Sequence, residues 1–430
     1  MSDINKIINI LKEEIVPAQG CTEPIAIAYV SAKVAEVLGH TPEKMNIYVS
    51  GNMIKNVKSV LIPNSEGMVG IESSAALGAV AGDANEELMV ISKLTTDCIK
   101  KVKEYVNSHE INVTHEKTDI KLYVKIEAFY REDSALVEIK HFHTNITRIE
   151  KNGELLIDQI CNDIDFKTSQ DDRSLLTVKN IYEVSKTIDI KLIEPIFLQV
   201  VDLNTAIAEA GLSEKFGVNI GSLIQKNMDE GLYGKDVRNK CASFTSAGSD
   251  ARMSGCSLPV MTTSGSGNQG MTASLPVIKY CSERNLTHEQ MIRGLIFSHL
   301  TTIHLKTSVG RLSAYCGVMC AASAVSGAIA FLENAEYDVV ANAITNSLGN
   351  VSGVICDGAK ASCATKIASG VYAAFDSSML ALNNKWLQGG EGIIASDVEK
   401  TIKNIGVLAQ KGMKKTDEVI LGIMQNTKKD

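Results

Sequence analysis

The 430-residue chain is 45% hydrophobic and 22% charged, a composition that allows a large buried core and two or three domains. A net charge of −7 at neutral pH, without a cluster of lysines or arginines, excludes a nucleic-acid-binding protein. Ten cysteines accompany an N-terminus that lacks the basic start and apolar block of a secretion signal. This combination predicts a cytoplasmic protein whose thiols stay free or bind metal.

The first third of the chain is expected to mix helices with extended segments. Apolar spacing or small-residue composition predicts four helices, over residues 4–15, 22–38, 71–82 and 86–108. Thr22 is the expected cap of the second helix, with Pro24 in its first turn. Residues 45–63 are expected to be extended, with an interruption at Gly51-Asn52.

The clearest strand signal lies at residues 122–130, where apolar and polar side chains alternate. A polar turn and a second strand over residues 135–150 are expected to follow. His141 and His143 share one face of that second strand. A His-x-His pair can bind metal, but no third ligand is near in the sequence, so an ordinary half-exposed strand is the expectation.

A polar run at residues 165–174 is the best linker candidate, and the chain beyond it is predicted to be mostly helical. The fold class is therefore α+β, with a small mixed α/β domain at residues 1–165 and a larger, mostly helical domain at residues 166–430. Residues 312–332 carry no charge and are long enough to span a bilayer. Their richness in Gly, Ala, Ser and Cys instead predicts a buried core helix and no membrane association.

Several cysteines stand beside glycines and small residues, where a bulky inorganic group can approach the backbone. Cys21, in PAQGCTEP, precedes a predicted helix start, a position that favours anions and lowers the pKa of a thiol. Cys316 and Cys320 lie four residues apart in a predicted helix, and Cys356 and Cys363 flank the loop DGAKAS, which is too long for a compact zinc knuckle. Thiols that converge from distant segments suggest an iron–sulfur cluster. The cysteines interpreted as structural are Cys98, Cys161, Cys241, Cys256 and Cys281.

The segment TTSGSGNQGMTASLPV has exposed glycine N–H groups before a helix expected from about Met271. Such a segment can cradle a carboxylate or a phosphate. It matches neither the P-loop nor the dinucleotide-binding fingerprint. Its candidate substrate-binding residues are Ser266, Gly267, Asn268 and Gln269.

Three further polar residues, His304, Lys306 and Arg311, cluster directly upstream of Cys316 in HLKTSVGRLSAYC. Side chains of these types bind carboxylates or transfer protons. Each alone is more often a surface charge, but their place beside a candidate ligand favours a catalytic role.

Four segments together resemble a known family. PAQGCTEPIAIA, SGSGNQG, VGRLSAYCG and VICDGAKASCA, in this order between residues 17 and 370, resemble the L-cysteine desulfidase family, which is related to the alpha region of iron–sulfur L-serine dehydratases. The resemblance implies a lyase that uses an oxygen-sensitive 4Fe–4S cluster and no pyridoxal phosphate (PLP). It would convert L-cysteine to pyruvate, ammonia and sulfide.

The resemblance also implies roles for individual cysteines. Cys21, Cys316 and Cys356 correspond to the three cluster ligands, which leave one iron open for substrate. Cys363 either replaces one of them or lies nearby, and Cys320 has no counterpart. Since Cys21 belongs to the mixed part and the others to the helical part, the site is expected at the junction between domains.

Elimination also needs a base for the Cα proton and fixed donors for the carboxylate. The glycine segment, with Asn268, is the candidate carboxylate site, and Lys306 or His304 is the candidate base or orienting group. Arg311 and Lys360 are candidate charge partners. Asp357 is expected to orient the loop of Cys356 through hydrogen bonds.

Two alternatives stay open at this point. L-Serine or another small amino acid would use the same carboxylate site, with water as the leaving group. A non-catalytic metal-binding or redox-sensing protein would need the thiols but not the glycine segment. The expected partner is a small amino acid, with neither nucleic acid nor membrane, and the sequence leaves open whether the chain forms a homo-oligomer.

Overall fold

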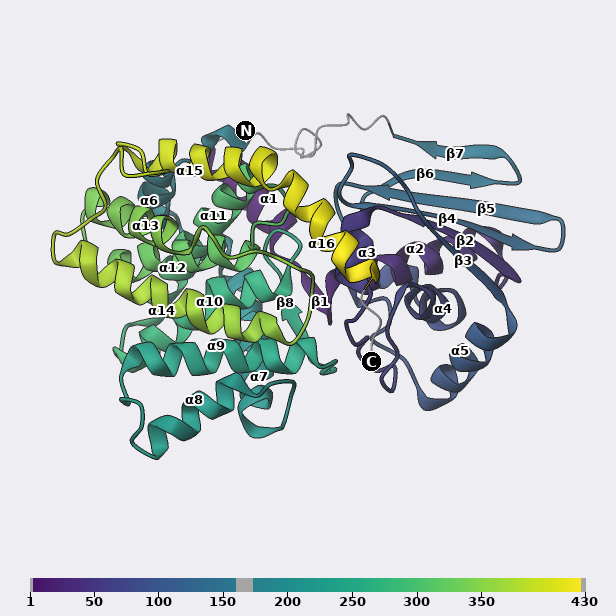
Figure 1. The fold of residues 1–430 in the computed structure, drawn as a ribbon, viewed down its shortest axis with the longest axis horizontal. Coiled ribbons are helices and arrows are strands. Elements are labelled where there is room, and N and C mark those ends of the chain that lie inside the picture. The colour runs from purple at the N-terminus through teal and green to yellow at the C-terminus, as the bar shows by residue number, and fades with distance from the viewer. Residues whose placement is uncertain (1–2, 160–172, 427–430) are drawn as a thin grey trace.

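The structure is a computed structural model that describes residues 3–159 and 173–426. A sheet with helices on one face lies beside a larger bundle of helices (Figure 1). The expected α+β fold, with a mixed N-terminal region and a mostly helical C-terminal region, is confirmed. Most of the expected linker at residues 165–174 and Cys161 lie outside the described residues.

The sheet of the N-terminal region has six strands in the order β3-β2-β4-β5-β6-β7. The strands are β2 (Lys44–Val49), β3 (Glu110–His115), β4 (Tyr123–Tyr130), β5 (Asp133–Lys140), β6 (Ile146–Lys151) and β7 (Glu154–Asp158). β2 and β3 run parallel, and the other neighbouring pairs are antiparallel. The alternation in β4 places Val124, Ile126 and Ala128 on the buried face, opposite buried residues of β2.

Helices cover one face of this sheet (Figure 1). They are α2 (Thr22–Leu38), α3 (Gly51–Val57), α4 (Ile71–Ala81), the short η1 (Ala84–Met89) and α5 (Thr96–Ser108). α2 packs on β4 and β5, and α4 packs on α2. The two helices approach so closely that a Cβ atom on Gly78 would lie 2.0 Å from the carbonyl oxygen of Ala28.

Two element predictions in this region are wrong. Residues 45–63 are not one extended segment, because the Ser50 hydroxyl accepts a hydrogen bond from the backbone N–H of Met53 and begins α3. Residues 86–108 are not one helix, because η1 ends at Met89 and Thr95 caps a separate helix, α5. Side-chain caps therefore overrode the longer apolar periodicity at both places.

The predicted second strand at residues 135–150 is two strands, β5 and β6. The chain reverses between them, and His141 adopts a left-handed backbone conformation there, with φ of 67°. His141 and His143 lie in this connection, and both are buried rather than half-exposed. The imidazole rings of both histidines therefore lie inside the molecule.

The C-terminal region is a bundle built around α12. Its elements are η2 (Arg173–Leu175), α6 (Val178–Thr187), η3 (Ile190–Leu192), α7 (Glu194–Ser213), α8 (Ile220–Asp229), α9 (Val237–Met253), α10 (Gly267–Glu283), α11 (His288–Val309), α12 (Gly317–Leu332), α13 (Tyr337–Val351), α14 (Ser362–Leu382), α15 (Val398–Val407), η4 (Leu408–Gly412) and α16 (Lys414–Asn426). α12 packs against α10, α11, α13 and α14, and nearly all its residues are buried, as a core helix requires. None of the described helices combines the length and apolar character needed to cross a membrane.

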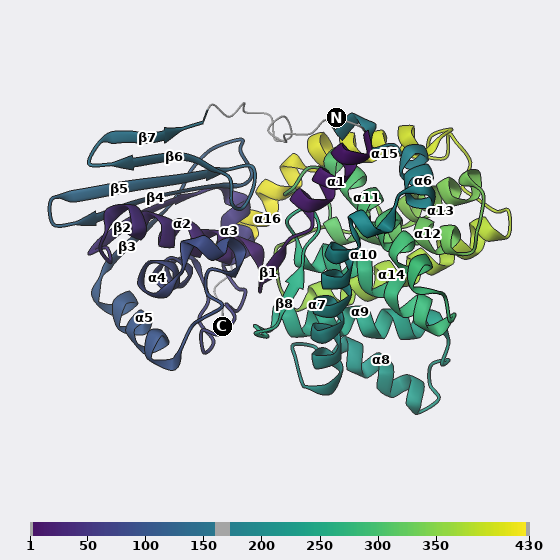
Figure 2. The same ribbon diagram turned by 180° about the vertical axis from the view of Figure 1, so that it is seen from behind.

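Elements near both chain ends cross between the two regions. α1 (Asp3–Glu14) contributes Ile7 and Leu11 to the hydrophobic core of the helical region, although it precedes the sheet in sequence. β1 (Pro17–Gln19) pairs antiparallel with β8 (Pro259–Met261) beside the junction (Figure 2). At the other end, α16 packs on α3 of the N-terminal region. These crossings bring the segment of Cys21 up to the helical region.

Candidate functional site

A cavity of about 100 Å³ lies between the two regions. It is lined by eight of the residues singled out from the sequence: Cys21, Ser266, Asn268, Lys306, Arg311, Cys316, Cys356 and Cys363. Cys21 comes from the N-terminal region and the others come from the helical region. Residues separated by more than 300 positions in sequence thus surround one cavity, at the junction where the site was expected.

Cys316 and Cys356 are held together by backbone pairing. Tyr315 and Ile355 form an isolated antiparallel bridge. The N–H of Cys316 donates to the carbonyl of Val354 over 3.2 Å, and the N–H of Cys356 donates to the carbonyl of Ala314 over 2.6 Å. Cys316 is also the N-cap of α12 rather than a residue inside that helix, so its Sγ is not constrained to the face that carries Cys320.

Cys363 lies in the first turn of α14, close to the other two thiols. Burial, followed by charge repulsion from the nearby Cys356 and Cys363, raises the pKa of Cys316 to about 12. Burial also raises the pKa of Cys363, and Cys356 contributes in the same direction. Cys316, Cys356 and Cys363 therefore form an interacting group, which we call the thiol trio.

Cys21 has different neighbours. Its Sγ donates to Glu23 Oε2 over 3.1 Å, and burial followed by the negative charge of Glu23 raises the pKa of Cys21 well above its ordinary value. A lowered pKa was expected from the helix start, but burial and the carboxylate outweigh the favourable end of α2 and the charge of Arg252. At neutral pH Cys21 is thus a protonated thiol.

Glu23 is a buried carboxylate that the sequence analysis missed. It lines the cavity and accepts hydrogen bonds from Cys21 and from Asn56 Nδ2, the latter over 3.0 Å. His143 Nε2 lies 3.9 Å from Glu23 Oε1. Burial alone would raise the pKa of Glu23, but His143 and the thiol of Cys21 lower it to about 2. The acidic residue two positions after the cysteine in QGCTEP was the available sequence signal.

The cavity lining includes four thiols, the side chains that hold iron–sulfur clusters in proteins. Within residues 3–159 and 173–426, no three His, Cys, Asp or Glu side chains are grouped closely enough to hold one ion. A single zinc needs its ligand atoms within about 2.0–2.3 Å of one centre. A cluster binds each thiolate through a different iron, so its ligands lie farther apart. Thiol donors around one cavity therefore suit the cluster that the resemblance implies.

The glycine segment forms the start of α10. This helix begins at Gly267, not near Met271, and Ser266 caps it by accepting from the N–H of Gln269. Ser266 and Asn268 line the cavity, whereas Gln269 is buried and donates to the carbonyl of Thr263 over 3.0 Å. Gly267 is packed against Arg252, because a Cβ there would lie 2.5 Å from Arg252 Nε.

Arg252 of α9 is a second residue that the sequence analysis missed. It is buried, lines the cavity, and donates through Nε to the carbonyl of Gly20 over 3.0 Å. The Thr22 hydroxyl donates to the carbonyl of Gly265 over 2.8 Å. These two bonds hold the Cys21 segment against α9 and α10, and no local sequence pattern marks Arg252.

Lys306 is a buried cation that lines the cavity and interacts with its thiols. Its side chain is buried, and its Nζ lies 3.2 Å from the position that a Cβ on Gly317 would occupy. Burial lowers the pKa of Lys306, although the thiols of Cys320, Cys356 and Cys316 oppose that shift. A lysine with a lowered pKa reaches the neutral amine more readily, which a general base requires.

The other predicted cations are placed differently. Arg311 lines the cavity, but its charge is paired with Glu14 over 2.6 Å. His304 lies outside this cavity and pairs with Glu399 over 2.8 Å. Lys360 also lies outside the cavity lining and pairs with Asp357 over 3.0 Å. Asp357 additionally accepts from Lys366 over 2.5 Å, which steadies the loop of Cys356.

Most of the chain matches one known protein family. The family model described as serine dehydratase alpha chain matches residues 84–422. The chain belongs to the serine dehydratase alpha chain family. Family membership supports an enzyme of the lyase type, related to the amino-acid dehydratases.

Curated relatives match the chain over nearly their whole length. A UPF0597 protein of Fusobacterium nucleatum subsp. nucleatum is 60% identical over 421 residues, which cover 98% of this chain and 99% of the relative. UPF0597 proteins of Desulfitobacterium hafniense and Lachnoclostridium phytofermentans are 44% and 43% identical, over 97% and 98% of this chain and 96% and 99% of each relative. The matches to these relatives thus span both regions of this chain.

The serine dehydratase alpha chain match covers only one side of the cavity. It includes Lys306 and the thiol trio, but it begins after Cys21, Glu23 and Lys55 in the sequence. The family match therefore includes the cavity residues of the helical region but not those of the segment around Cys21.

Proposed function

We propose that this protein is a PLP-independent lyase that converts L-cysteine and water to pyruvate, ammonia and hydrogen sulfide with the aid of a 4Fe–4S cluster. The observation that carries the proposal is one cavity lined by four thiols, Lys306 and the start of α10. The family assignment supports the lyase class.

The thiol trio is the proposed ligand set for the cluster. Cys356 raises the pKa of both Cys316 and Cys363, a penalty on their ionisation that binding to a cationic iron centre would relieve. Cys21 faces the same cavity but is hydrogen-bonded to Glu23. When bound, the cluster would supply a Lewis acid for the departing thiolate.

The residues at the start of α10 are the proposed carboxylate site. Ser266 and Asn268 supply a hydroxyl and an amide at the N-terminus of this helix, where anions are favoured. The buried Arg252 adds a positive charge to the same cavity. A carboxylate held there would be stabilised further as negative charge develops at Cα.

Lys306 is the proposed base. As a neutral amine it would accept the Cα proton, and the electron pair left at Cα would expel sulfur from Cβ as sulfide. The product, aminoacrylate, tautomerises to an imine, and water then releases ammonia and pyruvate. Burial of Lys306 keeps bulk water away from the proton-transfer step.

L-Serine is the second candidate substrate, and the family to which the chain belongs favours it. The same carboxylate site and base would serve, with hydroxide as the leaving group. A binding site for one small side chain does not by itself discriminate strongly between a thiol and a hydroxyl substrate.

The test is anaerobic reconstitution with iron and sulfide, followed by separate assays of pyruvate release from L-cysteine and L-serine. We expect cluster absorption and turnover of L-cysteine above L-serine. Cys316→Ala and Cys356→Ala should lose both properties, whereas Cys281→Ala, which removes a buried thiol outside the cavity lining, should keep them. A protein that loads iron yet forms pyruvate from neither amino acid would overturn the proposal.

A further inference from the structure

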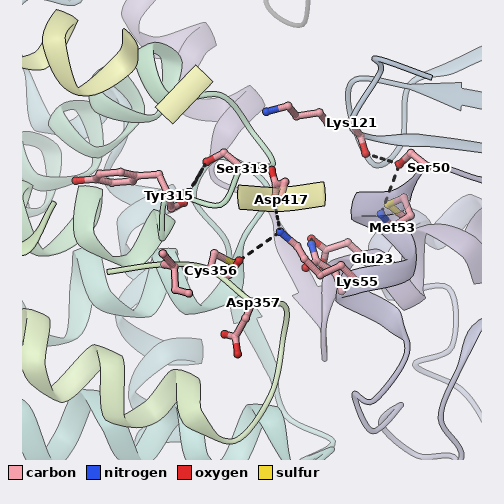
Figure 3. A network of polar contacts seen from close by, with 12 residues as sticks. Glu23, Ser50, Met53, Lys55, Lys121, Ser313, Tyr315, Cys356, Asp357 and Asp417 are labelled. Atoms are coloured by element: carbon pink, nitrogen blue, oxygen red, sulfur yellow. Dashed lines mark hydrogen bonds and ion pairs between the residues drawn. The ribbon is translucent and has the colours of Figure 1, made fainter. Parts of the chain in front are cut away.

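Lys55 of α3 makes a contact that joins both regions at the cysteine site. Its side chain is 2% exposed, and its Nζ pairs with Asp417 Oδ1 of α16 over 2.6 Å. The same Nζ donates to the backbone carbonyl of Cys356 over 3.3 Å (Figure 3). A buried ammonium with two partners holds both in place, because either one alone would leave part of its charge uncompensated.

Three hydrogen bonds restrain the backbone around Cys356. Its N–H donates to Ala314, its own carbonyl accepts from Lys55, and the preceding carbonyl of Ile355 accepts from Lys366 over 3.0 Å. Gly358 has φ of 96°, and a Cβ there would lie 2.4 Å from the carbonyl oxygen of Lys55. The loop of Cys356 therefore rests directly on α3, in a conformation that favours glycine.

α3 also reaches the other side of the cavity. Asn56, the residue after Lys55, donates to Glu23, and Glu23 accepts from Cys21. Adjacent residues of one short helix thus contact the segments of two cavity cysteines that are more than 300 residues apart in sequence.

α16 holds α3 from the outside (Figure 1). A Cβ on Gly51 would lie 2.6 Å from Leu421 Cδ2, so this leucine packs directly on the start of α3. Lys58 donates to the carbonyl of Met424 at the far end of the contact. The C-terminal helix therefore crosses from the helical region and fastens onto the N-terminal region beside Asp417.

Lys55 forms part of the wall of two cavities. One is the cysteine cavity, and the other is an outer cavity of about 560 Å³ that Asp417 and Leu421 of α16 also line. Asp417 is 13% exposed, and the pair with Lys55 stands between the cysteine cavity and the outer cavity. Displacement of α16 would expose Lys55 to water and weaken its hold on Cys356.

We propose that Lys55 is a positioning residue for Cys356 and that α16 acts, through Asp417, as a strap that keeps Lys55 in this role. The inference deepens the proposed function and rests on it for the consequence in catalysis. A lyase of this design needs its C-terminal helix in place to hold the cluster, although α16 itself does not line the cysteine cavity.

The test measures the reactivity of Cys356 in iron-free, full-length protein, so it does not depend on any enzymatic activity. Alkylation by iodoacetamide is followed by peptide mass spectrometry in Lys55→Met, Lys55→Arg and Asp417→Asn. Cys98 is the internal reference, because it is also partly exposed and lies in α5. We expect Cys356 to react on the order of tenfold faster in Lys55→Met and Asp417→Asn, since its loop opens locally, with Cys98 unchanged.

Lys55→Arg should restore the slow rate, because a guanidinium can still donate to both partners. Lys240→Met is the matched control, since it removes a 2.6 Å lysine–glutamate pair outside the cavity and should leave Cys356 unchanged. A merely structural role would lower the melting temperature of Lys55→Met without a selective change at Cys356, and that result would overturn the proposal.

Asp417→Asn and Leu421→Ala keep the test decisive if Lys55→Met does not fold, because both leave Lys55 in place. The reconstituted variants are then compared for the half-life of cluster absorption under anaerobic chelation. Faster loss of iron in Asp417→Asn and Leu421→Ala, with normal loss in Lys240→Met, supports the strap. Equal half-lives in all variants would contradict it, whichever amino acid proves to be the substrate.

Discussion

Tyr315 and Ile355 pair as an antiparallel bridge, and each is followed directly by a cysteine of the cavity. The bridge closes a loop of about 40 residues that contains α12 and α13. Since both backbones are hydrogen-bonded at the bridge, the backbones of Cys316 and Cys356 are fixed relative to each other. Cys363 then joins them from the first turn of α14. This arrangement, rather than sequence spacing, defines the thiol trio.

The trio predicts which thiols bind iron. We expect Cys316→Ser, Cys356→Ser and Cys363→Ser each to lose most of their iron after reconstitution, because each would remove one ligand. Cys21→Ser should keep iron, because the trio stays intact and a serine hydroxyl can still donate to Glu23. Iron per chain and cluster absorption are the measurements. Loss of iron from Cys21→Ser together with retention in Cys363→Ser would instead favour Cys21, Cys316 and Cys356 as the ligands.

Lys306 is the proposed general base, so its replacement should slow turnover. Lys306→Met should lower kcat by about 10²–10⁴-fold, the range for removal of a general base, while cluster absorption stays. Lys306→Arg keeps the positive charge but cannot supply a neutral amine, so it should be nearly as inactive. Lys279→Met, outside the cavity lining, is the control. Wild-type turnover in Lys306→Met would remove Lys306 from the mechanism.

His304 makes the opposite prediction. Because it pairs with Glu399 away from the cysteine cavity, His304→Gln should leave kcat and KM within about twofold. The cost to stability should be about 0–1 kcal/mol, as for other partly exposed pairs. Turnover and urea unfolding measure the two effects. A drop in kcat at unchanged stability would return His304 to the list of candidate bases.

Glu23 predicts a pH-dependent contribution to stability. Its pKa is about 2 in the folded protein, against an ordinary value of 4.5. Ionised Glu23 therefore stabilises the fold fully above about pH 4.5, by on the order of 3 kcal/mol, and this contribution disappears as pH falls toward 2. Glu23→Gln should be destabilised at pH 7, and its difference from the wild type should shrink below pH 4.5.

Urea unfolding of both proteins at several pH values between 7 and 3 measures this difference. Glu86→Gln, which removes an exposed partner of Lys93, serves as the control for a general acid effect. A difference that stays constant over this pH range would show that Glu23 acts through packing rather than through its charge.

Two glycine substitutions predict opposite changes in stability. Gly78→Ala should destabilise the protein by about 1–3 kcal/mol, because the new methyl group would overlap the carbonyl of Ala28. Gly422→Ala in α16 meets nothing within 4 Å and should stabilise by up to about 1 kcal/mol through helix propensity. Melting temperatures of the two variants measure the effects. Equal shifts of the same sign would contradict the close packing of α2 and α4.

The sequence by itself determined the α+β class, the uncharged core helix, expected at residues 312–332 and found at 317–332, and the cysteine segments that line the cavity. Periodicity and glycine-rich motifs are local properties, so one sequence is enough to find them. The boundaries at Ser50 and Thr95 failed because single side-chain caps decided them.

Only the tertiary structure decided which residues meet. Positions 304 and 306 lie two apart on α11 and so point to different sides, but the packing of that helix determines that Lys306 faces the thiols. Glu23 lies beside Cys21 in the sequence, but Arg252 and Lys55 join the cavity through contacts between segments more than 200 residues apart. Such contacts depend on how whole elements pack, and no local pattern in the chain encodes them.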